Sequence, residues 1–433
     1  MKSRSTPHYS VACGWNALLP ARAVRVEAPS KRKYDAIVVG AGFTGLAIAR
    51  RFAELQPTKE ILVLDAAEIG EGLSGRNSGI LAPTVIQPRA NAFGSAEEDA
   101  ARKSRIVLAG LDWLRDVVKN NDIRCDWIED APRIVAAATK QGVDKVRTSL
   151  ASLTKRALRY RERDREDLLV LIGTRYYEYG CEGFTHALIQ PAALIRGLAD
   201  TLPANVTLLE RTAAEAIEGS GLFQVVTKRG NFVGEKVFVA NNAHARSLDI
   251  ALYRMVVVHT YGALTPELDD TELDLLGRLP EWAILPPTAM GTTMRKWKRR
   301  ILIRSGHSYE RETSIDKVRS LLSSLYRNRY PTMPSYEFEH VWGGGVGITS
   351  NRENYFGELR RGLFVSAGCQ GAGVLRGSIH GKLLAELACE SQSSLLADRM
   401  KLSGPKWIPP EPLRGMGAVA QMAWQHWQAG REF

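Results

Sequence analysis

The chain has 433 residues, of which 45% are hydrophobic and 24% charged, a composition typical of globular proteins and a length sufficient for two or three domains. Its formal net charge is +11, and the absence of any run of about eighteen apolar residues argues against a membrane-spanning helix. The five cysteines show neither paired nor C-x-x-C spacing, and residues 1–30 lack the apolar core of a secretory signal, so we expect a cytoplasmic protein without a disulfide framework or metal site.

The strongest local signal is an apolar run that leads into a glycine-rich turn. Residues 37–39 are followed by Gly40, Gly42 and Gly45, and helical periodicity begins there. A second apolar run ends in Asp65, twenty residues after Gly45. Glycines at these spacings permit a tight turn, close approach to a pyrophosphate and close helix–strand packing, and the acidic residue accepts from ribose hydroxyls. Because helix N-termini also bind phosphates, the sequence predicts a dinucleotide-binding βαβ unit.

Apolar periodicity and turn residues predict the remaining elements. Pro191 favours a helix start, since proline suits the first helical position. The predicted helices cover residues 97–118, 141–161, 191–199, 315–326, 374–389 and 416–428, and the predicted strands cover residues 61–64, 133–137, 206–210, 223–227, 236–240, 255–264, 300–304 and 363–367. The strand at 236–240 ends in Asn241, at the edge where open α/β sheets place ligand contacts.

Dinucleotide-binding elements recur in three separate stretches of the chain, with other material inserted between them. This pattern predicts a mixed α/β (α+β) fold in which a discontinuous Rossmann-like cofactor domain is interleaved with a mixed-sheet substrate domain. The predicted boundaries are an N-terminal arm at 1–33, a cofactor domain at 34–125, 186–250 and 343–395, a substrate domain at 126–185 and 251–342, and a tail with a Trp-rich helix at 396–433. We expect the tail helix to pack on the cofactor domain.

Basic residues concentrate at residues 155–165 and 295–300. Such runs can bind nucleic acid or an anionic membrane, because clustered cations neutralise phosphates. They can also form a solvated helix face and a basic hairpin turn. In the first run arginines alternate with acidic residues, which suits local ion pairing, so we favour the second interpretation.

Four ordered motifs carry a family resemblance over nearly the whole chain. They are Ser-Gly-Arg-Asn-Ser-Gly at 74–79, Trp-Gly-Gly-Gly-Val-Gly-Ile-Thr-Ser-Asn-Arg at 342–352, Gly-Cys-Gln-Gly-Ala-Gly-Val at 368–374, and Pro-Pro-Glu-Pro-Leu-Arg at 409–414. Together they resemble the glycine/D-amino-acid-oxidase (DAO) superfamily of FAD-dependent amine oxidoreductases. The subgroup with the greatest similarity is the gamma-glutamylputrescine-oxidoreductase-like one.

The resemblance implies an FAD cofactor and a small-molecule amine substrate. The implied activity is oxidation of an amine C–N bond to an imine, by hydride transfer to flavin N5 and then hydrolysis. The electron acceptor, O₂ or another carrier, and the oligomeric state stay open. The implied FAD-binding residues are Gly40, Gly42, Phe43, Thr44, Gly45, Asp65, Ala66, Ser74, Arg76, Asn77, Ser78, Gly79, Ala214, Asn241, Gly368, Gln370, Gly371, Ala372, Gly373 and Val374.

Departures from the family pattern bear on the substrate. Amino-acid-specific relatives carry an arginine that binds the α-carboxylate, whereas residues 343–347 of this chain contain none. Because a bidentate arginine is the natural reader of a carboxylate, we expect an amine without a free α-carboxylate. Further departures are Thr293 and Met294 in place of aromatic residues, Ala372 in place of histidine, and Asn354 and Tyr355 in place of proline.

Several residues have both a catalytic and a structural interpretation. His259, Tyr261 and Trp342 are candidates for lining the substrate cavity over the flavin, and the alternative is a role in the core and hydrogen bonding of the second sheet. Arg76 supplies either a cation near the cofactor or an ion pair within its loop. Cys369 lies in the third motif, where it is either a packed side chain or the site of a covalent flavin bond.

Two other functions are compatible with the sequence. One is a flavoprotein that acts on an amine carried by RNA or tRNA, which the basic runs would serve, although we regard nucleic-acid binding as the less favoured reading. The other is a flavin-binding subunit of a larger oxidoreductase complex, for which the departures at Thr293, Met294 and Ala372 give the sequence support.

Overall fold

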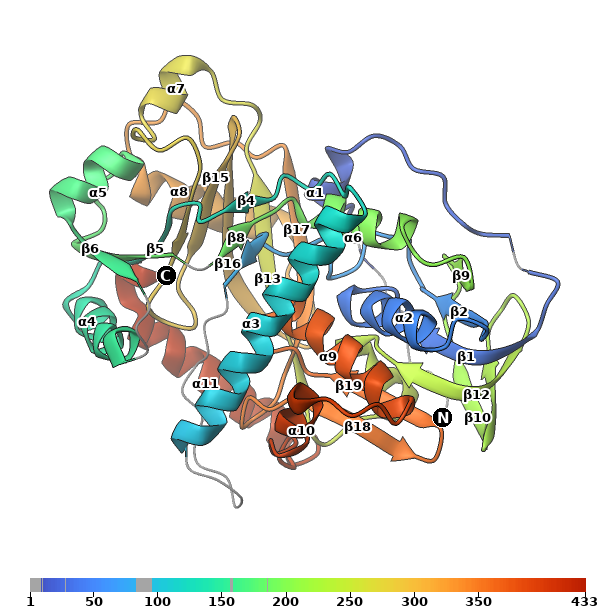
Figure 1. Cartoon of the computed structure of the whole chain (residues 1–433). Coiled ribbons are helices and arrows are strands. Elements are labelled where there is room, and N and C mark those ends of the chain that lie inside the picture. Colours follow the sequence, from blue (N-terminus) through green and yellow to red (C-terminus); the bar gives the residue numbers. More distant parts are fainter. Residues whose placement is uncertain (1–8, 10, 28, 83–95, 156–158, 185) are drawn as a thin grey trace.

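The structure is a computed structural model that describes the chain except residues 1–8, 10, 28, 83–95, 156–158 and 185. It is a mixed α/β fold with two eight-stranded sheets and one three-stranded sheet (Figure 1). None of the described helices is both long enough and apolar enough to cross a bilayer. Helices and loops pack against the two large sheets.

The first sheet has the order β10-β11-β12-β1-β2-β9, and β19 and β18 extend it from β12. Strands β1, β2, β9, β12 and β19 pair in parallel. Their continuous apolar runs are typical of strands buried on both faces. The bounds are β1 (Lys33–Val39), β2 (Ile61–Leu64), β9 (Val206–Leu209), β10 (Ala216–Ser220), β11 (Leu222–Val226), β12 (Phe232–Val239), β18 (Tyr355–Arg360) and β19 (Leu363–Ala367).

Two helices that start at the carboxyl edge of this sheet, α2 (Phe43–Leu55) and α9 (Gly373–Ala388), lie side by side. Their contact needs glycine, because a Cβ on Gly381 would lie 2.3 Å from the carbonyl oxygen of Thr44. Both N-termini therefore meet the same edge of the sheet. The remaining helices around this sheet are α1 (Gly14–Ala17), α3 (Ala96–Asn120), α6 (Pro191–Asp200) and α10 (Ser394–Met400).

The second sheet has the order β17-β13-β16-β15-β14-β5-β7-β6. Ile301 and Ile303 share a core with α8 (Ile315–Arg329), which covers one face of the sheet. We call this the helix face. The strands are β5 (Arg133–Ala137), β6 (Tyr160–Asp164), β7 (Tyr179–Gly183), β13 (Val256–Leu264), β14 (Trp282–Leu285), β15 (Thr293–Trp297), β16 (Arg300–Tyr309) and β17 (His340–Ile348).

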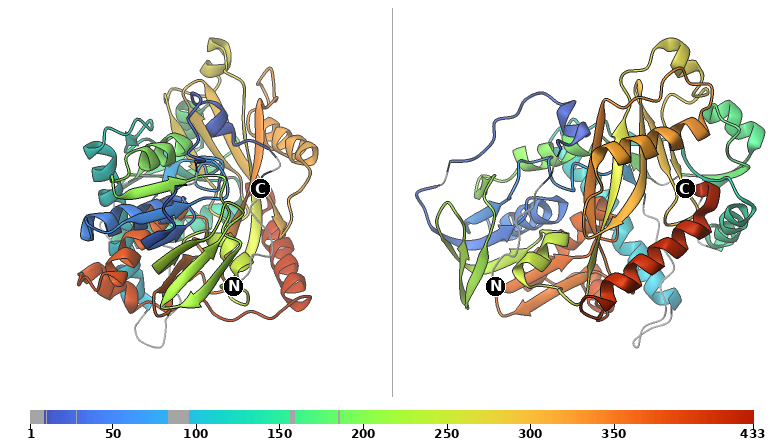
Figure 2. Two further views of the ribbon diagram at one scale, coloured as in Figure 1. Left: turned by 90° about the vertical axis from the view of Figure 1, so that its right-hand side faces the viewer. Right: turned by 180° about the vertical axis from the view of Figure 1, so that it is seen from behind.

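Smaller elements complete the fold. In both views of Figure 2 the tail helix α11 (Leu413–Ala429, red) lies below α8. The bounds are β3 (Ile80–Leu81), β4 (Ile128–Glu129), β8 (Ala187–Leu188), α4 (Lys140–Lys155), α5 (Arg165–Ile172), η1 (Asn242–Leu248), α7 (Asp270–Asp274), α11 (Leu413–Ala429) and η2 (Gly430–Glu432).

Three expectations about local structure are wrong. The helix predicted to reach residue 161 ends at Lys155, and the alternating basic and acidic residues that follow form β6, where Arg163 Nε donates to Glu182 on β7 at 2.9 Å. The alternation had the period of a strand. Arg295 lies within β15 and is fully buried, whereas a solvated turn was expected. The tail helix contacts β16 of the second sheet, where the ring centre of His426 lies 5.7 Å from that of His307.

Candidate active site

The turn after β1 can hold only glycine at two positions. Gly40 has φ of +102°, a left-handed value that other residues rarely adopt. A Cβ on Gly45 would lie 1.7 Å from the carbonyl oxygen of Gly40, so the first turn of α2 packs directly on the strand end. Gly42 precedes the helix, and a Cβ there would lie 2.8 Å from Ser74 Oγ. The helix N-terminus is therefore open to a ligand only while residue 42 lacks a side chain.

Asp65 lies at the end of β2 beside this turn. Its carboxylate accepts hydrogen bonds from the N–H of Ala41 at 2.7 Å and of Ala67 at 2.8 Å. Burial raises the pKa of the Asp65 carboxyl to about 6, although the two backbone donors oppose that shift. A carboxylate has about four lone-pair positions, so capacity remains for ribose hydroxyls.

Residues 70–79 form a loop, here called the glycine-rich loop, that crosses the N-terminus of α2. Ser74 Oγ accepts from the N–H of Phe43, the first residue of that helix, at 3.1 Å. Gly79 has φ of +67°, and a Cβ there would lie 2.1 Å from the carbonyl oxygen of Ile189. The loop is therefore tied at both ends to parts of the chain that are distant in sequence.

Donors from outside the loop bind every carbonyl oxygen from residue 75 to residue 79. They are Cys13 Sγ to Gly75 (3.3 Å), Trp342 Nε1 to Arg76 (3.0 Å), Trp15 Nε1 to Asn77 (2.8 Å), and Arg295 Nη1 to both Ser78 and Gly79 (3.1 Å each). The backbone N–H groups of Asn77 and Ser78 have no acceptor among the described residues. Oriented amides of this kind are suited to stabilising an anionic or electron-rich ligand.

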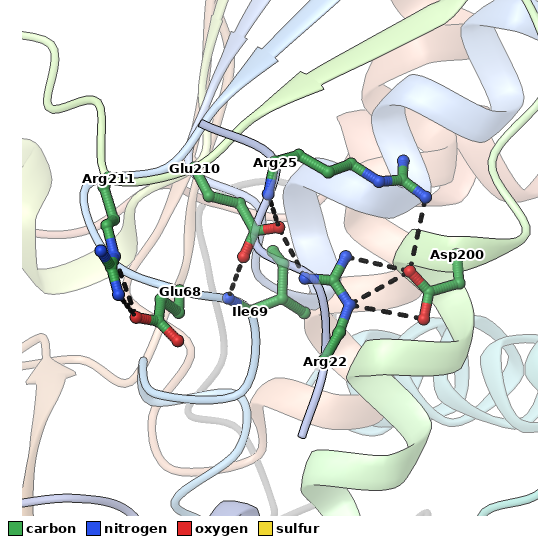
Figure 3. A network of polar contacts seen from close by, with 7 residues as sticks. All are labelled: Arg22, Arg25, Glu68, Ile69, Asp200, Glu210 and Arg211. Atoms are coloured by element: carbon green, nitrogen blue, oxygen red, sulfur yellow. Dashed lines mark hydrogen bonds and ion pairs between the residues drawn. The ribbon is translucent and has the colours of Figure 1, made fainter. Parts of the chain in front are cut away.

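The base of the loop is attached to the N-terminal segment by a buried carboxylate (Figure 3). Glu210 is fully buried and accepts from the N–H of Ile69 at 2.8 Å and from Arg22 Nη1 at 2.6 Å. Arg22 also pairs with Asp200 at 2.9 Å, and Arg211 pairs with Glu68. The start of the loop is thereby fixed between the first sheet and the segment that precedes β1.

Two arginines, Arg76 within the loop and Arg295 on β15, are both engaged by backbone carbonyls. Arg76 donates to the carbonyls of Val11 at 2.6 Å and Gly343 at 3.0 Å, and its guanidinium lies 4.4 Å from the ring centre of Tyr9. Arg295 donates to Ile189 as well as to the loop, and burial lowers its pKa to about 10. These contacts assign both side chains a part in holding the loop.

The loop after β19 is held by Asn242, whose Oδ1 accepts from the N–H groups of Gly368 at 2.9 Å and Cys369 at 3.1 Å. Gly371 has φ of +78°, and a Cβ there would meet nothing within 4 Å. The Oδ1 atom of Asn241 is buried without a hydrogen-bond partner in the described part of the chain. Burial also raises the pKa of the Cys369 thiol, which disfavours the thiolate.

These features converge because they follow the carboxyl ends of adjacent parallel strands. The predicted FAD-binding residues after β1, β2, β9, β12 and β19 lie on one edge, with Ala66 following Asp65 and Ala214 following β9. Thr44 and Val374 lie in the first turns of α2 and α9, beside Phe43 and Gly373, and Gln370 and Ala372 lie in the last loop. The N-terminus of α2, the orphaned Asn241 oxygen and the free amides of Asn77 and Ser78 together fit a dinucleotide.

The three proposed cavity residues do not share a face of the second sheet. Trp342 lies on the face that contacts the glycine-rich loop, which we call the loop face, and its ring packs beside Gly262. Tyr261 is on the helix face, where its Oη contacts Ser308 Oγ at 2.6 Å. His259, two residues before Tyr261, is on that same face, so the prediction that all three line one cavity is wrong. Neighbouring residues of a strand point to opposite faces, so residues two positions apart, such as His259 and Tyr261, share a face.

Sequence reasoning missed a cation on the loop face. Arg304 of β16 points to that face because Ile301 and Ile303 occupy the helix face, and it bonds hydroxyls of Thr260 and Thr293. A charged residue at the end of a continuous apolar run in a buried strand was the available signal. Its place beside the loop became visible only when the strands were paired.

Residues 35–387 match the family described as DAO: FAD dependent oxidoreductase. The chain belongs to this family. Because the family is FAD dependent, the protein is an FAD-dependent oxidoreductase, and FAD is the dinucleotide that the carboxyl edge of the first sheet fits.

Individual relatives extend over most of this DAO-family chain. A protein described as probable oxidoreductase OrdL from Rhizobium meliloti is 28% identical over 420 residues, which cover 91% of each chain. The gamma-glutamylputrescine oxidoreductase of Escherichia coli is 26% identical over 367 residues, covering 82% of this chain and 83% of the relative. Both relatives support the predicted subgroup. Glycine oxidase from Geobacillus kaustophilus has a similar fold, with a TM-score of 0.69 at 20% identity over 84% of this chain and 96% of that one.

Proposed function

We propose that the protein oxidises the C–N bond of a small amine that lacks a carboxylate next to the reacting carbon, giving an imine that water hydrolyses. FAD, when bound, accepts the hydride from the carbon beside nitrogen at its N5 atom. The similarity to gamma-glutamylputrescine oxidoreductase and to glycine oxidase supports an amine as the substrate class.

The observation that carries the proposal is the absence of an available arginine along β17. Residues 343–347 contribute four glycines and Val346 to this strand, and Val346 is on the loop face with Gly344. Arg76 and Arg295 are bound to backbone carbonyls and are poorly placed to bind a carboxylate instead. An α-carboxylate brought to this position without a partner would cost several kcal/mol.

The chain's own residues serve to bind and orient. The N–H groups at the start of α2 and in the glycine-rich loop stabilise negative charge, and Asp65 holds ribose hydroxyls. Trp342 and Gly344 form a rigid wall beside the loop, because Trp342 is fixed by its bond to the Arg76 carbonyl. Such fixed walls exclude water from the reacting centre.

Several described cations of the two basic runs form internal ion pairs. Arg163 pairs with Glu182, Arg299 with Asp270 at 2.7 Å, and Lys298 with Asp126 at 2.8 Å. These pairs reduce the positive potential available to an RNA backbone. We therefore favour a free small molecule over an RNA-borne amine.

Anaerobic flavin bleaching tests the proposal. The protein should be yellow, release FAD on denaturation, and be reduced faster by alkylamines than by glycine or D-alanine at equal concentration. Reduction by a simple α-amino acid that is faster than reduction by every amine tested would contradict the proposal. A colourless protein that binds NADH tightly would contradict the cofactor assignment as well.

A further inference from the structure

Arg304 has unused hydrogen-bonding capacity on the loop face. Its Nη1 donates to Thr260 Oγ1 at 3.3 Å and its Nη2 to Thr293 Oγ1 at 3.1 Å, and both acceptors are neutral. Arginine has five N–H donors, so three have no acceptor in the described part of the chain. The residue as a whole is not fully buried.

No carboxylate of this protein neutralises Arg304. Among the described residues no Asp or Glu lies within ion-pair distance of it, and the residues outside the described ranges contain neither Asp nor Glu. Burial lowers the pKa of its guanidinium, and no acidic group opposes that shift. Arg295 differs, since three backbone carbonyls accept from it. The contacts of Arg295 show a side chain that holds neighbouring backbone in place. The charge of Arg304, by contrast, has no carboxylate partner in the described part of the chain.

His307 is a second polar group beside Arg304 with an unmet hydrogen bond. It pairs with Thr260 across β13 and β16, and its Nδ1 atom is buried without a partner in the described structure. Burial, Arg304 and His426 lower its pKa to about 3, so the ring is neutral near pH 7. The neutral imidazole of His307 can donate or accept a hydrogen bond here, and Arg304 supplies the positive charge that would bind an anion.

Arg304 lies within a few strand spacings of the glycine-rich loop. Thr260 is paired with Gly344 of β17, and a Cβ on Gly344 would lie 3.0 Å from Leu73 of that loop. Neighbouring strands are about 4.8 Å apart, so the guanidinium beside Thr260 lies roughly 5 to 10 Å from the strand that adjoins the loop. With the amine oxidised beside the glycine-rich loop, as the proposed function has it, a substrate group at Arg304 would be several covalent bonds from the reacting carbon.

We propose that Arg304, together with Thr260 and Thr293, forms an anion subsite that binds a carboxylate carried several bonds away from the oxidised C–N bond. The substrate class is then ω-amino carboxylic acids and other amines with a remote carboxylate. This inference rests on the proposed amine oxidation, and it deepens it by naming the group that the far end of the substrate carries. On this proposal an α-amino acid, whose carboxylate is one bond from the reacting carbon, would not reach the subsite.

Matched pairs of ligands test the subsite in the FAD-loaded protein. Anaerobic stopped-flow bleaching compares 5-aminopentanoate with pentylamine, and norvaline serves as the isomer with an adjacent carboxylate. Pentanoate and pentanol, which cannot be oxidised, are titrated while the flavin absorbance spectrum is recorded. We expect 5-aminopentanoate to bind at least about 10-fold tighter than pentylamine, and pentanoate to perturb the spectrum at lower concentration than pentanol, because hydrogen bonds to a charged group are strong.

Arg304→Gln should weaken binding of 5-aminopentanoate and pentanoate by about 10- to 100-fold and leave pentylamine within about twofold. Arg304→Lys should retain part of the affinity, and Lys317→Gln, an exposed charge on α8, should change neither ligand pair. If Arg304→Gln loses FAD, the ligand comparison in the wild type and in Thr293→Val still decides the question. Equal binding of each pair in the wild type, or equal loss of both in Arg304→Gln, would overturn the subsite. Failure of every amine to bleach the wild type would instead overturn the proposed function.

Discussion

Replacing Gly42 with alanine should weaken FAD binding much more than it weakens the fold. Gly42 has φ of −78° and ψ of −175°, which any residue adopts, so alanine adds no backbone strain. The new Cβ would lie 2.8 Å from Ser74 Oγ and displace that hydroxyl from the Phe43 N–H. Loss of this one hydrogen bond costs about 1 kcal/mol of folding free energy.

The cost to FAD is larger because the methyl group occupies the space at the N-terminus of α2. Each N–H bond to a charged phosphate is worth about 1.5 to 3 kcal/mol, so the loss of two such bonds weakens FAD binding by roughly 100-fold or more. Gly42→Val, which adds more bulk, should abolish retention of the cofactor through purification.

Ser74→Ala is the matched control, since it removes the same hydrogen bond to Phe43 without adding atoms at residue 42. Apoprotein of each variant is titrated with FAD by quenching of flavin fluorescence, and thermal unfolding gives the change in stability. Both variants should lose about 1 kcal/mol of stability, and only Gly42→Ala should lose most of its FAD affinity. If Gly42→Ala binds FAD as tightly as Ser74→Ala does, the pyrophosphate lies elsewhere.

Three further outcomes follow from the site. Gly45→Ala should destabilise the whole fold, measured as a lower unfolding temperature even without FAD, because its Cβ would lie 1.7 Å from the Gly40 carbonyl oxygen. Burial raises the pKa of Asp65 to about 6 in the free protein, and ribose hydroxyls favour its ionised form, so binding releases a proton. FAD affinity should thus rise between about pH 5 and about pH 7, and Asp65→Asn should flatten the profile. Flavin reduction should rise with pH and level off below about 10.4, the value of a free alkylamine, because only the neutral amine reacts. His259→Ala and Tyr261→Phe should slow flavin reduction, measured by stopped flow, by about tenfold or less. A roughly thousandfold slower reduction in His259→Ala, with a flattened pH profile of the rate, would instead show that His259 is the general base.

The cofactor half of the molecule is predictable because its signals are local. The glycines at 40, 42 and 45 act on residues within one turn, and Asp65 ends a strand whose apolar run is continuous. The strands at 61–64, 133–137 and 363–367 have the bounds that the sequence predicted. These features depend on backbone conformation and on neighbours in sequence, which a single chain reveals.

The second sheet is less predictable because its geometry depends on pairing between distant strands. Arg295 looked solvated, yet its acceptors include Ile189, which no periodicity near residue 295 could identify. The face that Tyr261 and Arg304 occupy depends on register, and a bulge between β13 and β16 shifts that register at Thr260. A shift of one residue exchanges the two faces of a strand, so the sequence alone could not assign these side chains.

The glycine-rich loop is held by three parts of the chain that are distant in sequence. Its carbonyls are bound by Trp15 from the N-terminal segment, by Trp342 from β17 and by Arg295 from β15, so the loop takes its shape only when all three parts have folded around it. A loop without these contacts would lose conformational entropy each time that a ligand ordered it. The cost is about 1 to 2 kcal/mol for each residue fixed. Because the carbonyls of this loop are already bound, the entropy cost of ordering it falls on folding and not on cofactor binding. The free N–H groups of the loop are then already oriented before a cofactor binds. The second sheet therefore contributes to the shape of the loop that crosses the N-terminus of α2, through Trp342 and Arg295.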